Sequence, residues 1–246
     1  MLYLKGLVVE LGGRTIIKGV DLSLGDGELA LLLGPNGSGK STLLHAIVGD
    51  PRYRVASGSI VFEGKELTGL KMEERVRLGL GLSFQFPPRL KGIRLRHLML
   101  RILEKRGLRG TEAEDALEEY SRLLRMESLL DKDFNVGFSG GEAKRAELML
   151  TLAQKPRLLL LDEPDSGVDV ENLGVIGPAI LHYVSSNGGA AILITHTGYI
   201  ARHVKASGAY VLLDGRIVCS GNPEEIVSNI MQHGFEACEE CRRARR

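Results

Sequence analysis

The chain has 246 residues, 43% of them hydrophobic and 26% charged, with a formal net charge of +1. This composition excludes a disordered or fibrous protein, and the near-neutral charge gives no support to a nucleic-acid partner, which usually requires a strongly basic surface. No apolar run approaches the roughly 18 residues that cross a bilayer, the first residues do not read as a secretion signal, and 3 cysteines predict no disulfide framework, so we expect a cytoplasmic protein without direct membrane insertion.

The first third of the chain predicts a β-sheet with one helix. Alternating or continuous apolar residues predict strands over 2–9, 16–24, 29–33 and 59–62. The segment 29–33 is apolar throughout, as expected for a strand that is buried on both faces. It runs through a glycine-rich loop into a predicted helix over 41–48.

The middle of the chain has a different pattern. From about residue 70 to 155 the charge density rises and apolar residues recur at helical spacing. Strand patterns then return over 157–161, 190–195, 210–213 and 216–218. We therefore predict an α/β fold in a single domain spanning 1–246, with a catalytic core from 1–85 and 155–246 and a helical subdomain over about 86–154.

The glycine-rich loop fits the pattern G-x-x-x-x-G-K-[ST] with Gly34, Pro35, Asn36, Gly37, Ser38, Gly39, Lys40, Ser41 and Thr42. Glycines let successive backbone N–H groups point at phosphates, and the following helix adds its positive end. We expect Lys40 to reach the β- and γ-phosphates of ATP and the Ser41 hydroxyl to bind Mg²⁺. An accidental match occurs in roughly one chain in a hundred, and the strand before and helix after it make an accident implausible.

Two acids follow the apolar segment 158–161. An ordinary strand end explains one acid but gives no reason for a pair after a phosphate loop. We predict that Asp162 holds Mg²⁺, directly or through water, and that Glu163 polarises the attacking water as a general base.

Two further polar residues follow predicted strands. His196 directly follows the segment 192–195, and Gln85 follows the strand-like segment 80–84. A single histidine is more often structural, but this position favours contact with the γ-phosphate. The Gln85 amide is predicted to touch Mg²⁺ or water.

The sequence Ser139-Gly140-Gly141-Glu142 precedes a helical segment. Ser139 and Glu142 form a capping-box pattern. Two glycines in a first helical turn are each unfavourable by roughly 1 kcal/mol relative to alanine. Bare backbone at a helix N-terminus suits an incoming phosphate, so chemistry explains the two glycines better than folding does.

These motifs resemble those of the ABC (ATP-binding cassette) ATPases, in the family's order: P-loop 34–42, Q-loop Gln85, signature 139–142, Walker B 158–162 with Glu163, D-loop 166–169 and switch His196. The resemblance covers nearly the whole chain. It implies a P-loop NTPase core with a mixed sheet, antiparallel β elements near the N-terminus, and ATP and Mg²⁺ as cofactors. It also implies an ATP-dependent homodimer or a pairing of two cassettes, in which Ser139 and Gly141 serve nucleotide held by the partner.

The sequence departs from the family's pattern at the residue that contacts the adenine base of the nucleotide. The family often carries an adenine-stacking aromatic residue near the first strand, and the aligned position here is Leu11. The resemblance therefore implies only apolar contact with adenine at that position, and weak discrimination between bases.

Several segments resemble the SufC-type branch of the family, namely 49–58, 83–87, 137–145 and 165–169. That branch implies the ATPase subunit of an iron–sulfur cluster assembly complex with a SufB/SufD-like scaffold partner. We predict the scaffold contact at 85–99, with Phe84, Phe86 and Leu90 as apolar anchors; the competing interpretation is that these aromatic residues pack in the core. The alternative is an energy subunit of a membrane transporter that docks its partner at the same surface. A cassette acting on DNA or ribosomes usually has tandem cassettes or a long coiled-coil insert, and this chain has neither.

Cys238 and Cys241 form a Cys-x-x-Cys pair with His233 upstream. They could bind iron or zinc if a partner supplied another ligand. The alternative, which we favour, is a solvated tail whose cysteines are incidental.

Overall fold

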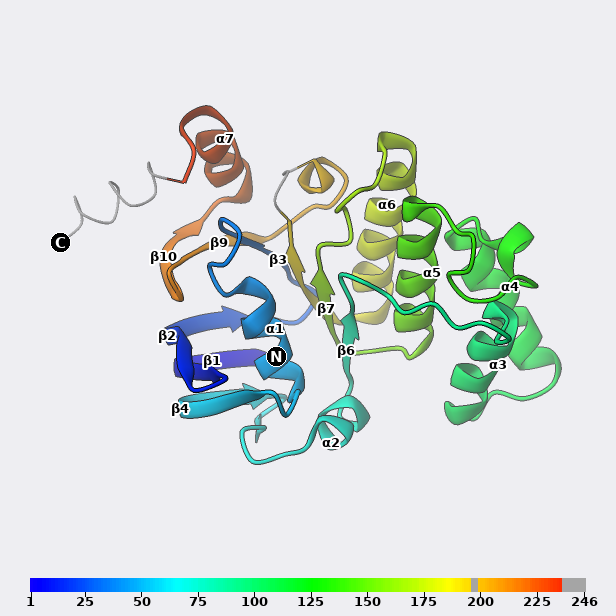
Figure 1. Cartoon of the computed structure of the whole chain (residues 1–246), viewed down its shortest axis with the longest axis horizontal. Helices are drawn as coiled ribbons and strands as arrows, with labels where there is room; N and C mark the ends of the chain where they lie inside the picture. The colour runs from blue at the N-terminus through cyan, green and yellow to red at the C-terminus, as the bar shows by residue number, and fades with distance from the viewer. Residues whose placement is uncertain (196–198, 236–246) are drawn as a thin grey trace.

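The computed structural model describes residues 1–195 and 199–235, which form two β-sheets flanked by helices (Figure 1). The smaller sheet has the strand order β2-β1-β4-β5 and is antiparallel. Its strands are β1 Leu2–Leu11, β2 Arg14–Leu24, β4 Tyr53–Phe62 and β5 Lys65–Glu66. The larger sheet has the order β10-β9-β3-β8-β7-β6. Its strands are β3 Leu29–Leu33, β6 Leu80–Ser83, β7 Leu158–Asp162, β8 Ala190–Ile194, β9 Gly208–Leu213 and β10 Arg216–Gly221.

The larger sheet is mixed. Strands β9, β3, β8, β7 and β6 are parallel, and β10 returns antiparallel to β9 through a tight turn. The predicted mixed sheet and the antiparallel elements near the N-terminus are thus confirmed. Because the carboxyl ends of parallel strands share one edge of a sheet, the segments that follow β3, β6, β7 and β8 leave the sheet along the same edge.

Two apolar clusters cover the two faces of the larger sheet. Along β7, Leu158 and Leu160 face the cluster formed with the smaller sheet and with helix α1 (Lys40–Val48), whereas Leu159 and Leu161 face the cluster formed with helices α5 (Gly140–Ala153) and α6 (Val170–Asn187). Alternate side chains of a strand point to opposite faces. Burial on both faces explains why β3 and β7 are apolar throughout.

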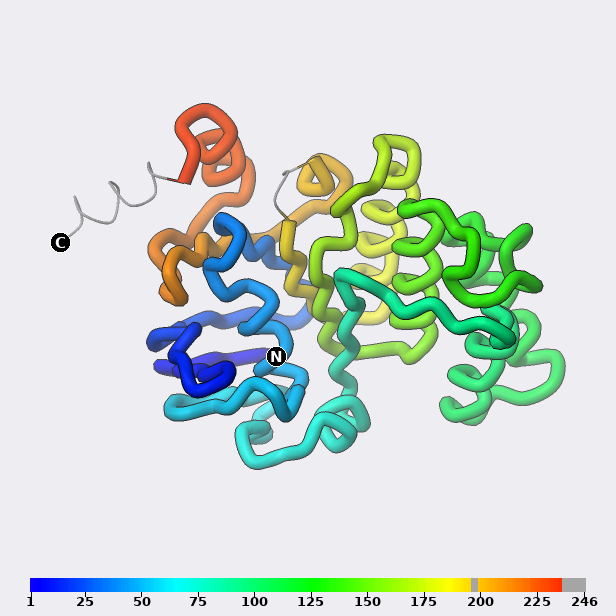
Figure 2. The backbone as a smooth tube through the Cα atoms, in the orientation of Figure 1, coloured from blue at the N-terminus to red at the C-terminus, as the bar shows by residue number. Residues whose placement is uncertain are grey.

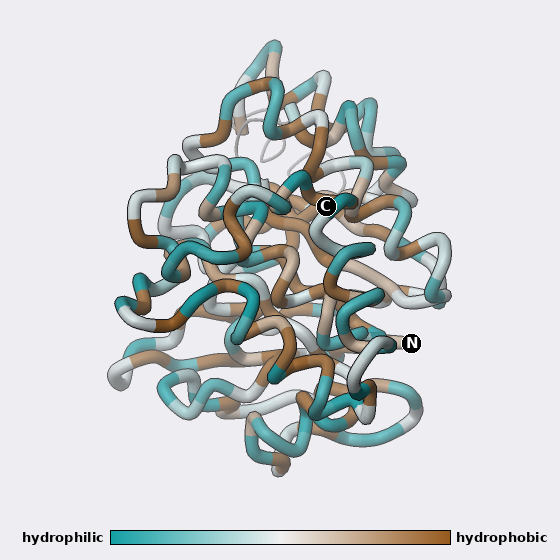
Figure 3. Tube along the Cα trace, turned by 90° about the vertical axis from the view of Figure 1, so that its right-hand side faces the viewer, coloured by the Kyte–Doolittle hydropathy of each residue, from teal (hydrophilic) through white to brown (hydrophobic). Residues whose placement is uncertain are grey.

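The remaining helices are α2 Met72–Arg77, α3 Leu95–Lys105, α4 Thr111–Leu123 and α7 Pro223–His233, with short 3-10 turns at Glu127–Leu129 and Ile200–Arg202. In α3 the buried side chains are Leu95, Met99 and Leu103, one on each turn. Helices α3 and α4 lie beyond α5 at one end of the molecule (Figures 1 and 2). Figure 3, which views that end, shows hydrophilic and hydrophobic stretches alternating along the same segments, as amphipathic helices require.

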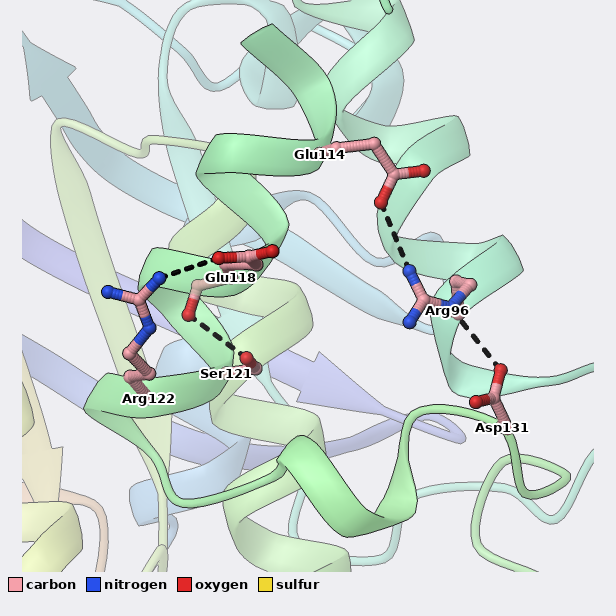
Figure 4. A network of polar contacts seen from close by, with 6 residues as sticks. All are labelled: Arg96, Glu114, Glu118, Ser121, Arg122 and Asp131. Atoms are coloured by element: carbon pink, nitrogen blue, oxygen red, sulfur yellow. Dashed lines mark hydrogen bonds and ion pairs between the residues drawn. The ribbon is translucent and has the colours of Figure 1, made fainter. Parts of the chain in front are cut away.

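Polar contacts join the helices on their outer side (Figure 4). The Arg96 guanidinium lies 3.0 Å from the Glu114 carboxylate of α4 and 3.3 Å from Asp131. Arg122 and Glu118 pair one turn apart along α4. Exposed ion pairs of this kind contribute only about 0.2–1 kcal/mol each. The apolar contacts of α3, α4 and α5 therefore provide most of the stability of this region.

The two-residue strand β5 was not predicted, and three longer elements also differ from the sequence prediction. Strand β4 begins at Tyr53, because residues 53–58 pair with β1. The patterns did not identify α6, whose interior contains Pro178, or the short α7. Among residues 1–195 and 199–235, no helix combines the length and apolar character that a bilayer crossing needs.

Candidate functional site

The glycine-rich loop connects β3 to α1 at the shared strand edge. Gly34 has a φ of 154°, and a Cβ there would lie 2.2 Å from the Leu212 carbonyl oxygen, so only glycine fits. Among the described residues, the Ser38 hydroxyl is a buried group without a hydrogen-bond partner. Gly39 precedes α1 and has no side chain to cap the helix, which leaves the first N–H groups of α1 for a ligand. These features fit a phosphate group.

Lys40 is folded back onto this loop. Its side-chain Nζ donates hydrogen bonds of 2.9 Å to the carbonyls of Gly34 and Pro35, and the residue is only 4% exposed. Burial lowers the pKa of Lys40, while the negative charges of Glu163 and Asp162 oppose that shift. The loop therefore holds a cation among carboxylates, in position to meet an anionic ligand.

The structure brings Ser41 of α1 to Asp162 at the end of β7. The Ser41 hydroxyl donates a 3.0 Å hydrogen bond to the Asp162 carboxylate. Burial raises the pKa of Asp162, and the hydrogen bond from Ser41 opposes that shift. Mg²⁺ commonly takes one or two protein oxygens and completes its shell with phosphates and water. The pair fits such an ion, although no group of three His, Cys, Asp or Glu side chains is poised for a metal within residues 1–195 and 199–235.

Glu163 and Gln85 also meet, although 78 residues separate them. The Gln85 amide nitrogen donates a hydrogen bond to the Glu163 carboxylate. Glu163 directly follows β7 and has a φ of 51°, in the left-handed region that is uncommon for residues other than glycine. The two sequence-predicted residues thus share one polar cluster with Asp162.

Sequence reasoning missed a residue at the centre of this cluster. Lys144 of α5 is 8% exposed, and its Nζ donates hydrogen bonds of 2.7 Å to the Gln85 carbonyl and 2.8 Å to the Glu163 carbonyl. Burial lowers the pKa of Lys144, and the charge of Asp162 opposes the shift most strongly. Glu147, one turn further along, accepts a 3.1 Å hydrogen bond from the Phe84 amide. Lys144 and Glu147 lie three apart among the apolar residues of α5, on the face that becomes buried, and this spacing was the available signal.

The capping box at the start of α5 is confirmed. The Ser139 hydroxyl accepts from the Glu142 amide at 3.2 Å, and the Glu142 carboxylate accepts from the Ser139 amide at 2.7 Å. The latter bond holds the pKa of Glu142 below its usual value. Gly141 also has a packing role, because a Cβ there would lie 2.4 Å from the Asn172 side chain of α6. Phosphate chemistry therefore explains only part of the glycine pair.

The helices that begin at the signature, 139–142, and at the phosphate loop pack on opposite faces of the larger sheet. Helix α1 packs in the cluster on one face of the larger sheet, and α5 packs in the cluster on the other, with β7 between them in Figure 1. The hydroxyl and amide of Ser139 bond within its own capping box.

Other predicted residues lie elsewhere. His196, Cys238 and Cys241 fall outside the described residues. Thr195, just before His196, is fully buried and donates a hydrogen bond to Asp165, which ties the end of β8 to the loop after β7. Leu11 ends β1 and is 37% exposed.

The sequence profile of the ABC transporter family matches residues 17–166. The chain belongs to the ABC family of ATP-binding cassettes. It is therefore an ATPase of the ABC type, and the prediction of this family from its motifs is confirmed.

Curated relatives carry two kinds of name. A probable ABC transporter ATP-binding protein of Streptococcus pyogenes serotype M3 is 38% identical over 90% of this chain and 89% of its own length. Escherichia coli SufC, named a probable ATP-dependent transporter, is 35% identical over 96% of this chain and 97% of its own. Vegetative protein 296 of Bacillus subtilis is 35% identical over 96% and 92%.

Solved structures match the fold over nearly its whole length. A nucleotide-free ATP-binding cassette from an ABC transporter superposes with a TM-score of 0.80 at 26% identity, covering 94% of this chain and 95% of that one. The ADP conformation of the cassette MJ1267 gives 0.79 at 26% identity, covering 95% of both.

Proposed function

We propose that this cassette hydrolyses ATP at a site shared by two chains. Lys40 and the backbone of 34–42 hold the phosphates, and Ser41, Asp162 and Gln85 hold Mg²⁺. The ion would supply charge neutralisation at the β- and γ-phosphates. Glu163 orients and deprotonates the attacking water, and His196 contacts the γ-phosphate. The Ser41–Asp162 hydrogen bond carries this proposal, because it joins the start of α1, directly after the glycine-rich loop, to the acid that ends β7.

The cluster around Glu163 supports its role as general base. The Gln85 amide bonds its carboxylate, and Lys144 bonds its backbone carbonyl. Lys144 also bonds the Gln85 carbonyl, so movement of the Gln85 segment or of α5 changes where the carboxylate points. A partner that contacts the Gln85 segment or α5 would therefore change the rate of hydrolysis by moving the Glu163 carboxylate.

The exposed start of the signature, Ser139 and Gly140, supports the two-chain site. Ser139 is exposed at the N-terminal end of α5, and the first N–H groups of a helix attract phosphate. Within one chain, α5 and α1 pack on opposite faces of the sheet. Ser139 and Gly141 would then contact nucleotide bound to the phosphate loop of a second cassette.

Light scattering of a Glu163→Gln variant tests the pairing. With Mg²⁺ and ATP, the slowed chemistry should trap a particle of twice the chain mass, whereas ADP should leave single chains. A single-chain mass at saturating ATP, with or without a scaffold protein, would contradict the two-chain site.

The cellular role we propose is the ATPase subunit of an iron–sulfur cluster assembly complex. ATP-driven closure of two cassettes would remodel SufB/SufD-like scaffold partners in the cytoplasm. Similarity to SufC over 97% of that protein supports this role, together with the SufC-like segments of the sequence. The second candidate, a transporter subunit, is favoured by the names of the Streptococcus pyogenes relatives.

The proposed partner surface follows β6. Phe86 is 83% exposed and Phe84 is 41% exposed. Leu90 packs partly against the core, so the two aromatic side chains are the available anchors. We further propose that the chain divides into a catalytic core, 1–85 and 155–246, and a helical subdomain over about 86–154. The partner would then bind where the helical subdomain begins.

Affinity capture from the source cells distinguishes the two roles. A soluble scaffold protein, retained by the native chain and lost with Phe86→Ala, supports cluster assembly; a multi-span membrane protein supports transport instead. Tyr3→Ala is the matched control, since Tyr3 is a 55% exposed aromatic residue of β1. Scaffold binding that survives Phe86→Ala would exclude this surface.

A further inference from the structure

A pocket of about 320 Å³ lies against the phosphate loop. Its lining residues come from three segments that are distant in the sequence: Pro35 to Ser38 of the loop, Leu213 and Asp214 at the end of β9, and Phe235 just after α7. Phe235 is half-buried and packs partly against the cluster of α5 and α6. An aromatic ring from the far end of the chain therefore borders the phosphate loop.

The wall opposite the loop is fixed by backbone contacts. The Gly215 amide donates a 3.0 Å hydrogen bond to the Ser38 carbonyl, and the Gly215 carbonyl accepts a 2.8 Å hydrogen bond from the Lys18 amide. A Cβ on Gly215 would lie 1.9 Å from the Ile16 carbonyl oxygen. The turn between β9 and β10 is thus held between β2 and the phosphate loop, and its position does not depend on Phe235.

Among the lining residues outside the phosphate loop, Asp214 and Phe235 suit a nucleobase better than a phosphate. The charged side chain in the pocket is Asp214, an exposed acid that would repel an anion. A carboxylate accepts hydrogen bonds from an exocyclic amino group, and a phenyl ring offers a face for base stacking. The pocket volume lies near the lower end of the range for small-ligand sites, as fits one part of a larger ligand.

Leu11 does not offer such a surface. It ends β1 with 37% of its area exposed, and the next two glycines have no neighbour within 4 Å of a built Cβ. An aliphatic side chain beside an open turn provides no aromatic face.

We propose that Phe235 and Asp214 form the base-binding wall of the nucleotide site. The segment after α7 then supplies the aromatic contact that β1 lacks. This proposal rests on nucleotide binding at the phosphate loop, and it differs from the expectation that the base keeps only apolar contact at Leu11.

Tryptophan fluorescence tests the position of the base directly, because the chain contains no tryptophan. Phe235→Trp and Leu11→Trp each create a protein with one tryptophan. Mg²⁺-ADP should quench the tryptophan at 235 and leave that at 11 within a few per cent of its starting intensity. Pyrophosphate with Mg²⁺ carries no base and should quench neither. Quenching at 11 and none at 235 would overturn the proposal.

Affinity measurements exclude a merely structural effect on the loop. Calorimetry with Mg²⁺-ADP should show a roughly 5- to 160-fold weaker Kd for Phe235→Ala, the range that stacking of one base represents (about 1–3 kcal/mol). Phe235→Tyr should bind as the native chain does, and Phe235→Leu should resemble Phe235→Ala. An ADP affinity within twofold of the native value for Phe235→Ala, or full affinity for Phe235→Leu, would contradict base stacking.

Lys40→Ala separates this inference from the proposed function. If Lys40→Ala abolishes ADP binding while Phe235→Ala has no effect, the phosphate site stands and the base wall is wrong. If the native chain binds no ADP, both are wrong.

Discussion

Glu147 should make the stability of the cassette depend on pH in a direction that is unusual for an acid. It is 6% exposed within α5, and burial raises its pKa from 4.5 to about 7. The folded chain therefore binds this proton more tightly than the unfolded chain. The contribution of Glu147 to stability is greatest below about pH 4.5 and declines as the pH rises to about 7, because ionisation is unfavourable only in the folded state.

The size of the effect follows from the shift. A rise from 4.5 to about 7 corresponds to about 3 kcal/mol, at 1.36 kcal/mol per pKa unit. In Glu147→Gln, an amide oxygen can still accept the hydrogen bond that the Phe84 amide donates to Glu147. The variant should match the native chain near pH 4.5 and exceed its free energy of unfolding by up to about 3 kcal/mol at pH 8.

Urea unfolding of both proteins between pH 4.5 and 8.5 measures this difference. Glu142→Gln is the control, because the Ser139 amide lowers the pKa of Glu142. The stabilisation by Glu142 is fully present above the unfolded pKa, so this variant should be less stable than the native chain by a nearly constant amount across this pH range. A constant difference between Glu147→Gln and the native chain across the range would refute the reasoning.

Three further variants test other contacts. Arg75→Met removes a buried guanidinium that donates to the Ala46 and Ile47 carbonyls at the end of α1; chemical denaturation should show a free energy of unfolding lower by about 2–4 kcal/mol, and an unchanged value would rule out this role. Lys144→Met should reduce steady-state ATPase activity roughly 10- to 100-fold by releasing the segment around Glu163, whereas native turnover would show that its two carbonyl bonds do not position the base. Ser139→Ala should lower the free energy of unfolding by about 1 kcal/mol through loss of the helix cap. It should also slow ATP turnover without changing the affinity of the single chain for ADP. Weaker ADP binding by the single chain would mean that Ser139 contacts the nucleotide of its own chain and not that of the partner.

Local patterns predicted the strands that position the site. Segments 29–33 and 158–161 are apolar at every position, and burial on both faces of one sheet explains that pattern. The polar residues that directly follow these strands were therefore found, and the structure joins Ser41 to Asp162 and Gln85 to Glu163.

Long-range packing produced what the sequence did not predict. Nothing near Lys144 in sequence indicates that α5 packs against β6, which places its ammonium between two carbonyls. The neighbours of Gly141 depend on Asn172, 31 residues away in α6. Phe235 likewise reaches the phosphate loop only through the path of β9, β10 and α7.

Complementation between two inactive chains tests most directly whether the ATP site is built from two protomers. One chain carries Lys40→Ala. The other carries Ser139→Glu, which sets a negative charge against the γ-phosphate and leaves a favourable acid at the helix N-terminus. Mixed pairs contain one intact site, so an equal mixture should regain up to about a quarter of native ATPase activity. A mixture no more active than the average of the two variants would contradict a site shared between chains.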